Sequence, residues 1–298
     1  MELLRTNYGR CMTADLDDDG RQELALAQMD PAASAPWRIE YYDGGESKME
    51  LISATPLSVG ATDISDWNSG TLSDGAPALF VTSYFGKDTR ITDVLCVREE
   101  GLQNISLAGE GEQSPNTFRP YGGVHPRDID GDGSTDLPVA RAVDAYGSSA
   151  SETFWWMDWF TWASDGSRNL TLTTYHSQDG WYLELPGTWQ SGFAMSREEN
   201  TDAGVRGVIF ARRPETAEPV EEPEEAREEV QPKPFLIIST LTGAERGELA
   251  NRSDRFILSS DNTTIYTGEF LDGWDCGLSQ EDLKTRFFLS GGSWSYTR

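Results

Sequence analysis

The chain has 298 residues, which is enough for two domains at about 100–200 residues per domain. Its 50 Asp and Glu outnumber its 24 Lys and Arg and give a formal net charge of −26 at pH 7, which argues against nucleic acid or an anionic membrane surface as a partner. The three cysteines have no metal-ligand spacing and allow at most one disulfide, so a disulfide-stapled scaffold is excluded as well.

The sequence lacks an apolar run of the roughly 18 residues that a membrane-spanning helix needs, so we expect no transmembrane segment. Residues Met1–Arg5 do not have the pattern of a signal peptide. The chain is therefore expected either to be intracellular or to lack its export signal and further N-terminal sequence. A monomer is expected.

The 10 Trp, 10 Tyr and 12 Phe, together with few long helix-forming runs, favour β structure. An Asp-rich loop starts at Asp15, and two β-prone runs then flank the turn Asp43–Gly45 and predict a hairpin. Thr62–Asp66 repeats the start of the first loop in weaker form; it lacks the third- and ninth-position carboxylates, so we expect no metal there. Strands are expected in this part of the chain at residues 24–27, 37–42, 49–52, 78–82, 92–97 and 102–107.

The third loop has the best-formed pattern. The loops start at Asp15, Asp63 and Asp128, and the second interval is longer than the first. A period of about 40–50 residues with several short strands is typical of a β-propeller, and the first interval fits it. Three repeats are too few for a closed ring, so residues 1–175 are expected to form an incomplete ring or to hold a fourth blade within 141–175.

The second half of the chain begins after a run of aromatic residues. For Phe154–Trp162 we prefer a buried strand with both faces packed over a platform that stacks on carbohydrate. Residues 215–229 carry eight Glu and one Arg, which predicts a disordered acidic Pro/Glu-rich loop at 212–234. Near the end, Ser279 followed by Asp282 predicts the start of a helix that ends at Arg286.

Both complete loops carry carboxylates at their first, third, fifth and ninth positions and glycine at the sixth. Hard cations such as Ca2+ select this oxygen-rich pattern, because the glycine lets the backbone curl until alternate carboxylates converge. The seventh residue would add its backbone carbonyl. The candidate ligands are Asp128, Asp130, Asp132, Ser134 and Asp136 in one loop and Asp15, Asp17, Asp19, Arg21 and Glu23 in the other.

A loop rich in Asp and Gly is often a simple turn, but two copies with matching flanks, one from Asp15 and one from Asp128, favour cation binding. The first loop departs further from the pattern, since the longer Glu23 takes the ninth position. Neither loop is an EF-hand, because position twelve, Leu26 or Val139, lies in a strand-like segment where an EF-hand has Glu.

The two loops and the strands after them, at Leu24–Leu26 and Leu137–Val139, resemble FG-GAP/VCBS repeats, the calcium-loop blades of integrin-type β-propellers. The resemblance covers the range 1–175. It implies a mainly β fold with a partial or small β-propeller at 1–175.

A looser resemblance extends over the rest of the chain and is to VCBS-repeat lipoproteins of Gram-positive gut bacteria. It implies a smaller α+β domain of the PsbP-like kind at 176–298, after the β-propeller. It also implies an extracellular or cell-surface protein, although the lipobox cysteine and signal that such proteins use are absent from this sequence. The segments that carry it are Asp136–Pro138, Trp181–Trp189, Phe287–Leu289 and Trp294.

Signatures of catalysis are missing from the sequence. It has two histidines, His125 and His176, and no GxSxG, HExxH or phosphate-cradling glycine loop, so we expect no enzyme. The main hypothesis is a calcium-binding module that recognises a protein or a glycan. One alternative is a structural spacer that displays the C-terminal domain, and the other is a carbohydrate-active enzyme with a pair of carboxylates.

Overall fold

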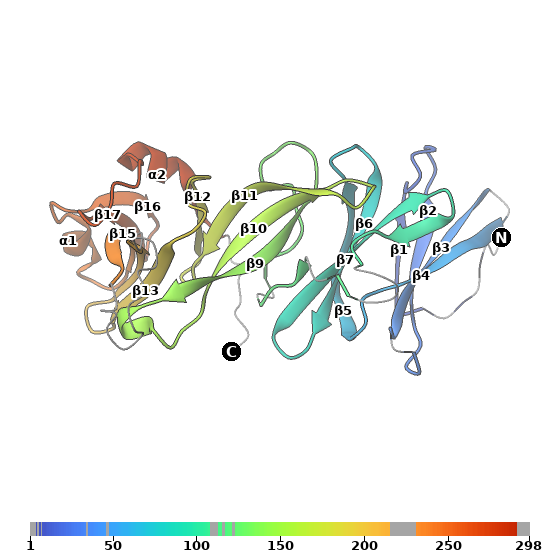
Figure 1. Ribbon diagram of the computed structural model, residues 1–298, viewed down its shortest axis with the longest axis horizontal. Coiled ribbons are helices and arrows are strands. Elements are labelled where there is room, and N and C mark those ends of the chain that lie inside the picture. The colour runs from blue at the N-terminus through green and yellow to red at the C-terminus, as the bar shows by residue number, and fades with distance from the viewer. Residues whose placement is uncertain are drawn as a thin grey trace, which may run out of the picture. The chain divides into compact units, whose positions relative to one another are not determined.

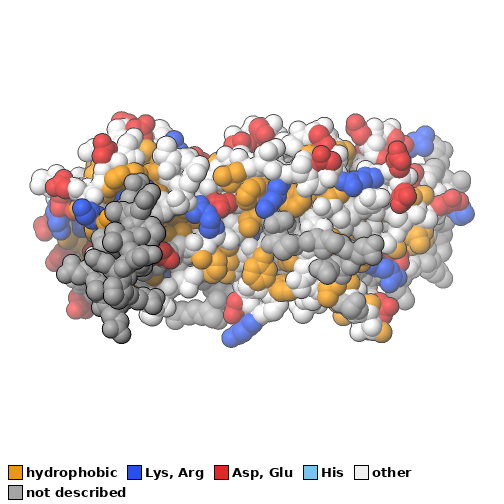
Figure 2. All heavy atoms as spheres, in the orientation of Figure 1, with side chains coloured by type: hydrophobic (Ala, Val, Ile, Leu, Met, Phe, Trp, Pro, Cys, Tyr) orange, Lys and Arg blue, Asp and Glu red, His pale blue; other side chains and the backbone are white. Residues whose placement is uncertain are grey.

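The computed structural model describes residues 4, 6, 8–33, 35–45, 48–107, 113–114, 117–120, 123–214 and 231–290. Within these residues the fold is mainly β, as predicted, and the helices are short. The described part of the chain contains no helix with the length and apolar character that a membrane span requires. On the face drawn in Figure 2, acidic and basic side chains are interspersed over the surface.

The strands pair into two four-stranded sheets and one ten-stranded sheet. The first sheet contains β1 (Arg10–Ala14), β2 (Glu23–Met29), β3 (Trp37–Gly45) and β4 (Lys48–Pro56). The second contains β5 (Ala61–Thr71), β6 (Pro77–Phe85), β7 (Thr89–Arg98) and β8 (Gly101–Asn104). The third contains β9 (Asp136–Ala145), β10 (Phe154–Trp162), β11 (Arg168–His176), β12 (Trp181–Leu185), β13 (Phe193–Asn200), β14 (Val205–Arg212), β15 (Lys233–Leu241), β16 (Phe256–Ser260), β17 (Ile265–Phe270) and β18 (Phe287–Leu289). The helices are the 3-10 helix η2 (Gly147–Ser149), α1 (Arg246–Ala250) and α2 (Gln280–Arg286).

Contacts between residues divide the chain into two compact units. Of the described residues, the first unit holds those up to Ala140 together with Asp158–Leu172, and the second holds Arg141–Met157 and those from Thr173 onward. This division differs from the predicted boundary after residue 175, because the long strands β9, β10 and β11 each contribute residues to both units.

In the first unit, each four-stranded sheet is an antiparallel meander of consecutive strands, which is the form of a β-propeller blade (Figure 1). The hairpin predicted around Asp43–Gly45 is confirmed, since β3 and β4 pair along their length. The pairing of β1 with β2 ends at Ala14 opposite Glu23, so the first Asp loop connects these two strands. The fold of this unit is therefore propeller-like.

The two meanders pack face to face. Alternate residues of β3, namely Trp37, Ile39 and Tyr41, are buried in one cluster with Leu79 and Val81 of β6. Because side chains alternate across a strand, this spacing aims one face of β3 at the second sheet.

The other face of β6 is covered too. Ala78 and Phe80 lie in a second cluster that also contains Leu137 of β9 and Trp162 of β10. A strand buried on both faces reads as a continuous apolar run, as Ala78–Val81 does. The second sheet thus lies between the first sheet and the part of the third sheet that belongs to this unit.

The prediction of a loop at Thr62–Asp66 is wrong. These residues belong to β5, where they pair with β6 through an irregular register. The connection that corresponds to the Asp loops is the tight turn Leu72–Ala76 between β5 and β6, and Asp74 is its single acidic residue. Asp74 lies almost midway in the sequence between Asp15 and Asp128, so the repeat is more even than predicted. Residues 141–175 form no separate blade but contribute β10, β11 and the end of β9.

The part of the ten-stranded sheet that belongs to the second unit curls around its own core. Its strand order is β16-β17-β15-β14-β13-β9-β10-β11-β12-β18, yet strands far apart in this order meet. The rings of Tyr266 in β17 and Phe287 in β18 are 5.6 Å apart, and those of Tyr175 in β11 and Phe210 in β14 are 5.5 Å apart. Helix α2 contacts both edge strands, β16 and β18. The sheet is therefore a nearly closed barrel.

Two local predictions in this half of the chain are confirmed. Ser279 accepts a hydrogen bond from the Asp282 N–H and the Asp282 side chain accepts one from the Ser279 N–H, so α2 starts with a capping box. The aromatic run is the strand β10, in which Trp156 and Trp159 are 1% and 0% exposed. The bounds of the acidic loop expected at 212–234 are too wide, because β14 ends at Arg212 and β15 begins at Lys233; residues 215–230 lie outside the described residues. The PsbP-like assignment stays a prediction.

Candidate metal centre

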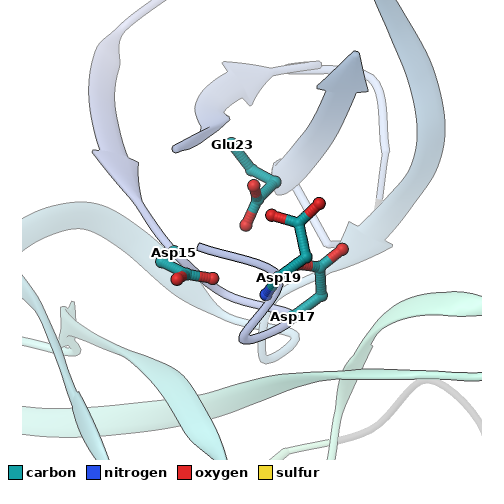
Figure 3. Close-up of side chains that lie close together, drawn as sticks. All are labelled: Asp15, Asp17, Asp19 and Glu23. Atoms are coloured by element: carbon teal, nitrogen blue, oxygen red, sulfur yellow. The ribbon is translucent and has the colours of Figure 1, made fainter. Parts of the chain in front are cut away.

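The first Asp loop brings four carboxylates together. Asp15, Asp17, Asp19 and Glu23 each offer an oxygen, and these oxygens lie within 4.8 Å of one another. Glu23 reaches down from the start of β2 toward the three aspartates of the loop (Figure 3). All four donors are oxygens, which suits a hard divalent cation.

Glu23 is the buried member of this group. It is 0% exposed, and its Oε2 accepts a hydrogen bond of 2.6 Å from the Leu16 N–H. Its Oε1 and the Asp15 Oδ1 are buried and have no hydrogen-bond partner. Burial, and to a lesser degree the charges of Asp17 and Asp15, raise the pKa of the Glu23 carboxyl, although the Leu16 N–H opposes this. A cation would give the two unpartnered oxygens the interaction that they lack, so the residues fit such an ion.

The backbone of this loop curls because two of its residues adopt left-handed conformations. Asp18 has φ 62° and Gly20 has φ 85°. The curl lets the Gly20 N–H donate to Asp15 Oδ2 at 3.0 Å and the Arg21 N–H donate to Asp19 Oδ1 at 2.8 Å. These bonds orient the aspartates before any ion arrives.

The second loop repeats this backbone pattern position by position. The Gly133 N–H donates to Asp128 Oδ2 at 3.0 Å, and the Ser134 N–H donates to Asp132 Oδ1 at 2.7 Å. The ninth carboxylate, Asp136, is again 0% exposed and accepts from the N–H of the second residue, Ile129, at 3.1 Å. The flanking bridge between Arg127 and Asp136 corresponds to that between Ala14 and Glu23.

The two loops differ at the ninth position and in the size of the cluster. Asp136 Oδ1 accepts a 2.6 Å hydrogen bond from the Thr171 hydroxyl of β11, so both of its oxygens have protein partners. Burial raises the pKa of Asp136, while the bond from Thr171 lowers it. The oxygens that lie within 4.8 Å of one another belong to Asp128, Asp130 and Asp136, and Asp132 is outside this group.

Most of the predicted ligands thus lie together in the two clusters. The three that contribute no side-chain oxygen to a cluster are Asp132, Arg21 and Ser134. Arg21 and Ser134 were predicted to act through their carbonyl oxygens, which stays a prediction; their N–H groups hold Asp19 and Asp132. Sequence reasoning missed Thr171, which is remote from Asp136 in the chain and has no local signal. It also missed the N–H of the second residue, although an apolar residue recurs there in both loops.

Comparisons with known proteins add little to this geometry. No protein-family model matches the chain, and neither does any curated protein. Among solved structures, a fructosyltransferase from A. japonicus is similar, with 9% sequence identity, a TM-score of 0.25, and coverage of 87% of this chain and 54% of that one. This chain therefore spans about half of that protein's length. A likeness at this TM-score carries no argument about the fold or activity of this chain.

The expectation that the chain is no enzyme is nevertheless corrected. It rests on motifs that are missing from the sequence, and a missing motif does not exclude catalysis; the enzyme structure named above has too low a TM-score to argue for or against an activity. We do not retain a non-catalytic assignment for this protein.

Proposed function

We propose that the two Asp loops bind Ca2+ and stiffen a module built from FG-GAP/VCBS-type blades. The module would belong to a secreted or cell-surface protein, carry a PsbP-like second domain and recognise a protein or a glycan. The observation that supports calcium most directly is the buried, unpartnered Oε1 of Glu23 beside three loop aspartates.

The physical reason is the cost of burying charge. A carboxylate taken out of water is strongly destabilised unless hydrogen bonds or an opposite charge compensate it. In the first loop, hydrogen bonds compensate one oxygen of Glu23 and leave the other without a partner. A bound Ca2+ would supply positive charge to all four carboxylates at once.

The position of the loops suggests what such binding would do. Each loop leads into a strand whose first residues are buried in the first unit, β2 in one case and β9 in the other. Fixing the loop would fix the start of that strand and with it the packing of neighbouring sheets. The exposed loop aspartates suit a compartment where Ca2+ is plentiful, since extracellular calcium modules commonly bind in the range of about 0.1–1 mM.

Calcium titration of the whole chain tests the proposal. We expect heat of binding for Ca2+ in calorimetry, weaker binding of Mg2+, which requires a tighter octahedral shell, and a melting temperature that rises with Ca2+ and falls with chelator. A melting curve that chelator leaves unchanged, together with no heat of binding, would rule out the calcium assignment.

A further inference from the structure

A polar cavity of about 710 Å3 lies wholly within the second unit. Three segments line it: η2 with the turn after it, the turn between β11 and β12, and the paired strands β13 and β14. Its volume falls in the range of about 300–1,000 Å3 that is usual for ligand sites.

The cavity lies at the end of the barrel, next to the last layer of buried apolar side chains. On β13, Met195 belongs to the core and Arg197, two residues later, lines the cavity. On β14, Val208 belongs to the core and Arg206, two residues earlier, lines the cavity. Residues two apart on a strand share a face, so both arginines stand on the core side at the end of the barrel. Mouths of barrels are common ligand sites.

Each of these arginines is held by a carboxylate that also lines the cavity. Arg197 Nη1 lies 2.9 Å from Glu152 Oε2, and Arg206 Nε lies 2.5 Å from Asp179 Oδ1. The Arg197 guanidinium also lies 4.9 Å from the ring centroid of the buried Phe154.

Two buried serines fix the backbone behind these pairs. Ser149 Oγ accepts from the Arg197 N–H at 3.0 Å, and Ser177 Oγ accepts from the Asp179 N–H at 3.1 Å. The cavity therefore presents two pre-oriented pairs, each with a donor beside an acceptor.

The hydrogen-bonding chemistry of these pairs selects the ligand. A guanidinium only donates and a carboxylate only accepts, whereas a hydroxyl does both. Two hydroxyls on adjacent carbons can therefore meet one pair, with one accepting from the arginine and the other donating to the carboxylate.

The net charge of the residues that line the cavity further restricts the class of ligand that can bind there. Glu199, two residues after Arg197 and on the same face of β13, also lines the cavity, so three carboxylates stand against two arginines. This excess of negative charge disfavours anionic ligands. Neutral polyhydroxylated molecules satisfy both conditions, because their hydroxyls match the donor and acceptor of each pair and they carry no negative charge.

We propose that this cavity binds a neutral sugar unit through vicinal hydroxyls, with Arg197–Glu152 and Arg206–Asp179 as its two recognition pairs. The inference takes the glycan from the proposed function and assigns it a site in the second unit, apart from the residues that would bind calcium.

Binding of the full chain to an array of neutral oligosaccharides tests the site, with uronic-acid and sulfated glycans on the same array. We expect binding to neutral glycans and little to the anionic ones. Arg197→Gln and Arg206→Gln should each lower the affinity roughly tenfold or more, because each removes charged hydrogen bonds to the ligand. Arg213→Gln is the matched control: it breaks the exposed pair Arg213–Asp144, at 3.1 Å, outside the cavity, and should leave the affinity unchanged.

Gln178→Trp gives a second test that leaves the ion pairs intact. Gln178 is exposed and lines the cavity, so a large ring there should block the ligand without disturbing the core. Its binding result decides the matter if an arginine variant fails to fold.

Three results would overturn the inference: no neutral glycan bound, binding confined to anionic glycans, or full affinity in the folded arginine variants and in Gln178→Trp. Calcium titration of the same samples separates this from the proposed function. Calcium binding without glycan binding defeats only the cavity, and glycan binding that depends on the cavity without any calcium binding defeats only the metal assignment.

Discussion

The two Asp loops have the same pattern of backbone hydrogen bonds, but they differ in the partners of their ninth carboxylate. In the Asp15 loop, the ninth carboxylate keeps a buried oxygen free and faces three aspartates. In the Asp128 loop, both oxygens of the ninth carboxylate accept hydrogen bonds from the protein, one from the Ile129 N–H and one from the Thr171 hydroxyl. In the second loop, hydrogen bonds from the protein compensate both oxygens of the ninth carboxylate. In the first loop, a cation would have to compensate one of them.

This difference reverses the ranking that the sequence pattern suggests. By pattern, the loop with four aspartates is the better calcium site and the one with Glu23 departs from it. By geometry, the longer arm of Glu23 completes a cluster of four carboxylates, whereas the second cluster has three. We therefore expect the first loop to bind Ca2+ more tightly.

The largest expected effect is on calcium-dependent stability. A ligand at 100 times its Kd stabilises a fold by about 2.7 kcal/mol, so loss of the tighter site should remove most of the calcium-dependent rise in melting temperature. Asp17→Ala with Asp19→Ala should therefore remove more of this rise than the matched pair Asp130→Ala with Asp132→Ala. Thermal unfolding with Ca2+ and with chelator measures both; an equal or larger loss for the second pair would contradict the ranking.

A second experiment compares substitutions of the two ninth-position residues, Glu23 and Asp136, in the metal-free protein with chelator present. Glu23→Gln removes a buried charge that lacks compensation while an amide oxygen can still accept from Leu16, so the metal-free protein should become more stable. Asp136→Asn also removes a buried charge but weakens two satisfied hydrogen bonds, so it should stabilise the metal-free protein less than Glu23→Gln does, or destabilise it. Chemical denaturation gives both free energies of unfolding, and a gain for Asp136→Asn as large as that for Glu23→Gln would contradict the comparison.

The raised pKa of Glu23 adds a pH dependence to the same variants. The folded, metal-free protein binds a proton at Glu23 more readily than the unfolded chain does, so the stability contributed by this group rises as the pH falls from neutral toward the ordinary value of 4.5. The Glu23→Gln variant should lack this contribution. Denaturation in chelator at several pH values checks it, and an unchanged slope in the variant would argue against it.

A smaller effect is expected at Thr171. Thr171→Val removes the hydroxyl that donates to Asp136, so stability in chelator should fall by about 1 kcal/mol. The freed oxygen should at the same time strengthen calcium binding by the second loop. Thr201→Val, at an exposed turn, is the control. Unchanged calcium affinity in Thr171→Val would show that this hydroxyl does not compete with an ion.

The smallest effect concerns the fourth loop position, which is left-handed in both loops. Asp18 has φ 62° there and Gly131 has φ 83°, and nothing lies within 4 Å of a Cβ built on Gly131. Asp18→Gly should therefore stabilise slightly or stay neutral, whereas Gly131→Ala should cost about 1 kcal/mol from backbone strain alone. Melting temperatures in chelator compare the two, and a neutral Gly131→Ala would contradict the assigned strain.

Several features followed from the sequence because their causes are local. The positions of the loop carboxylates, the glycine at position six and the capping box of α2 each depend on residues a few positions apart. The β class and the burial of the aromatic run at Phe154–Trp162 followed from composition and continuous apolar character.

The tertiary structure alone decided what depends on strand register and on packing between distant segments. Thr171 reaches Asp136 because β11 passes the second loop, and Thr62–Asp66 became strand because β6 pairs with it. The curl of the third sheet brought the turn between β11 and β12, with Asp179, to the cavity that Arg197 and Arg206 line. The sequence by itself determined the chemistry that each loop offers; tertiary packing decided how many of those oxygens remain free for an ion, because hydrogen bonds and burial come from residues that are remote in the chain.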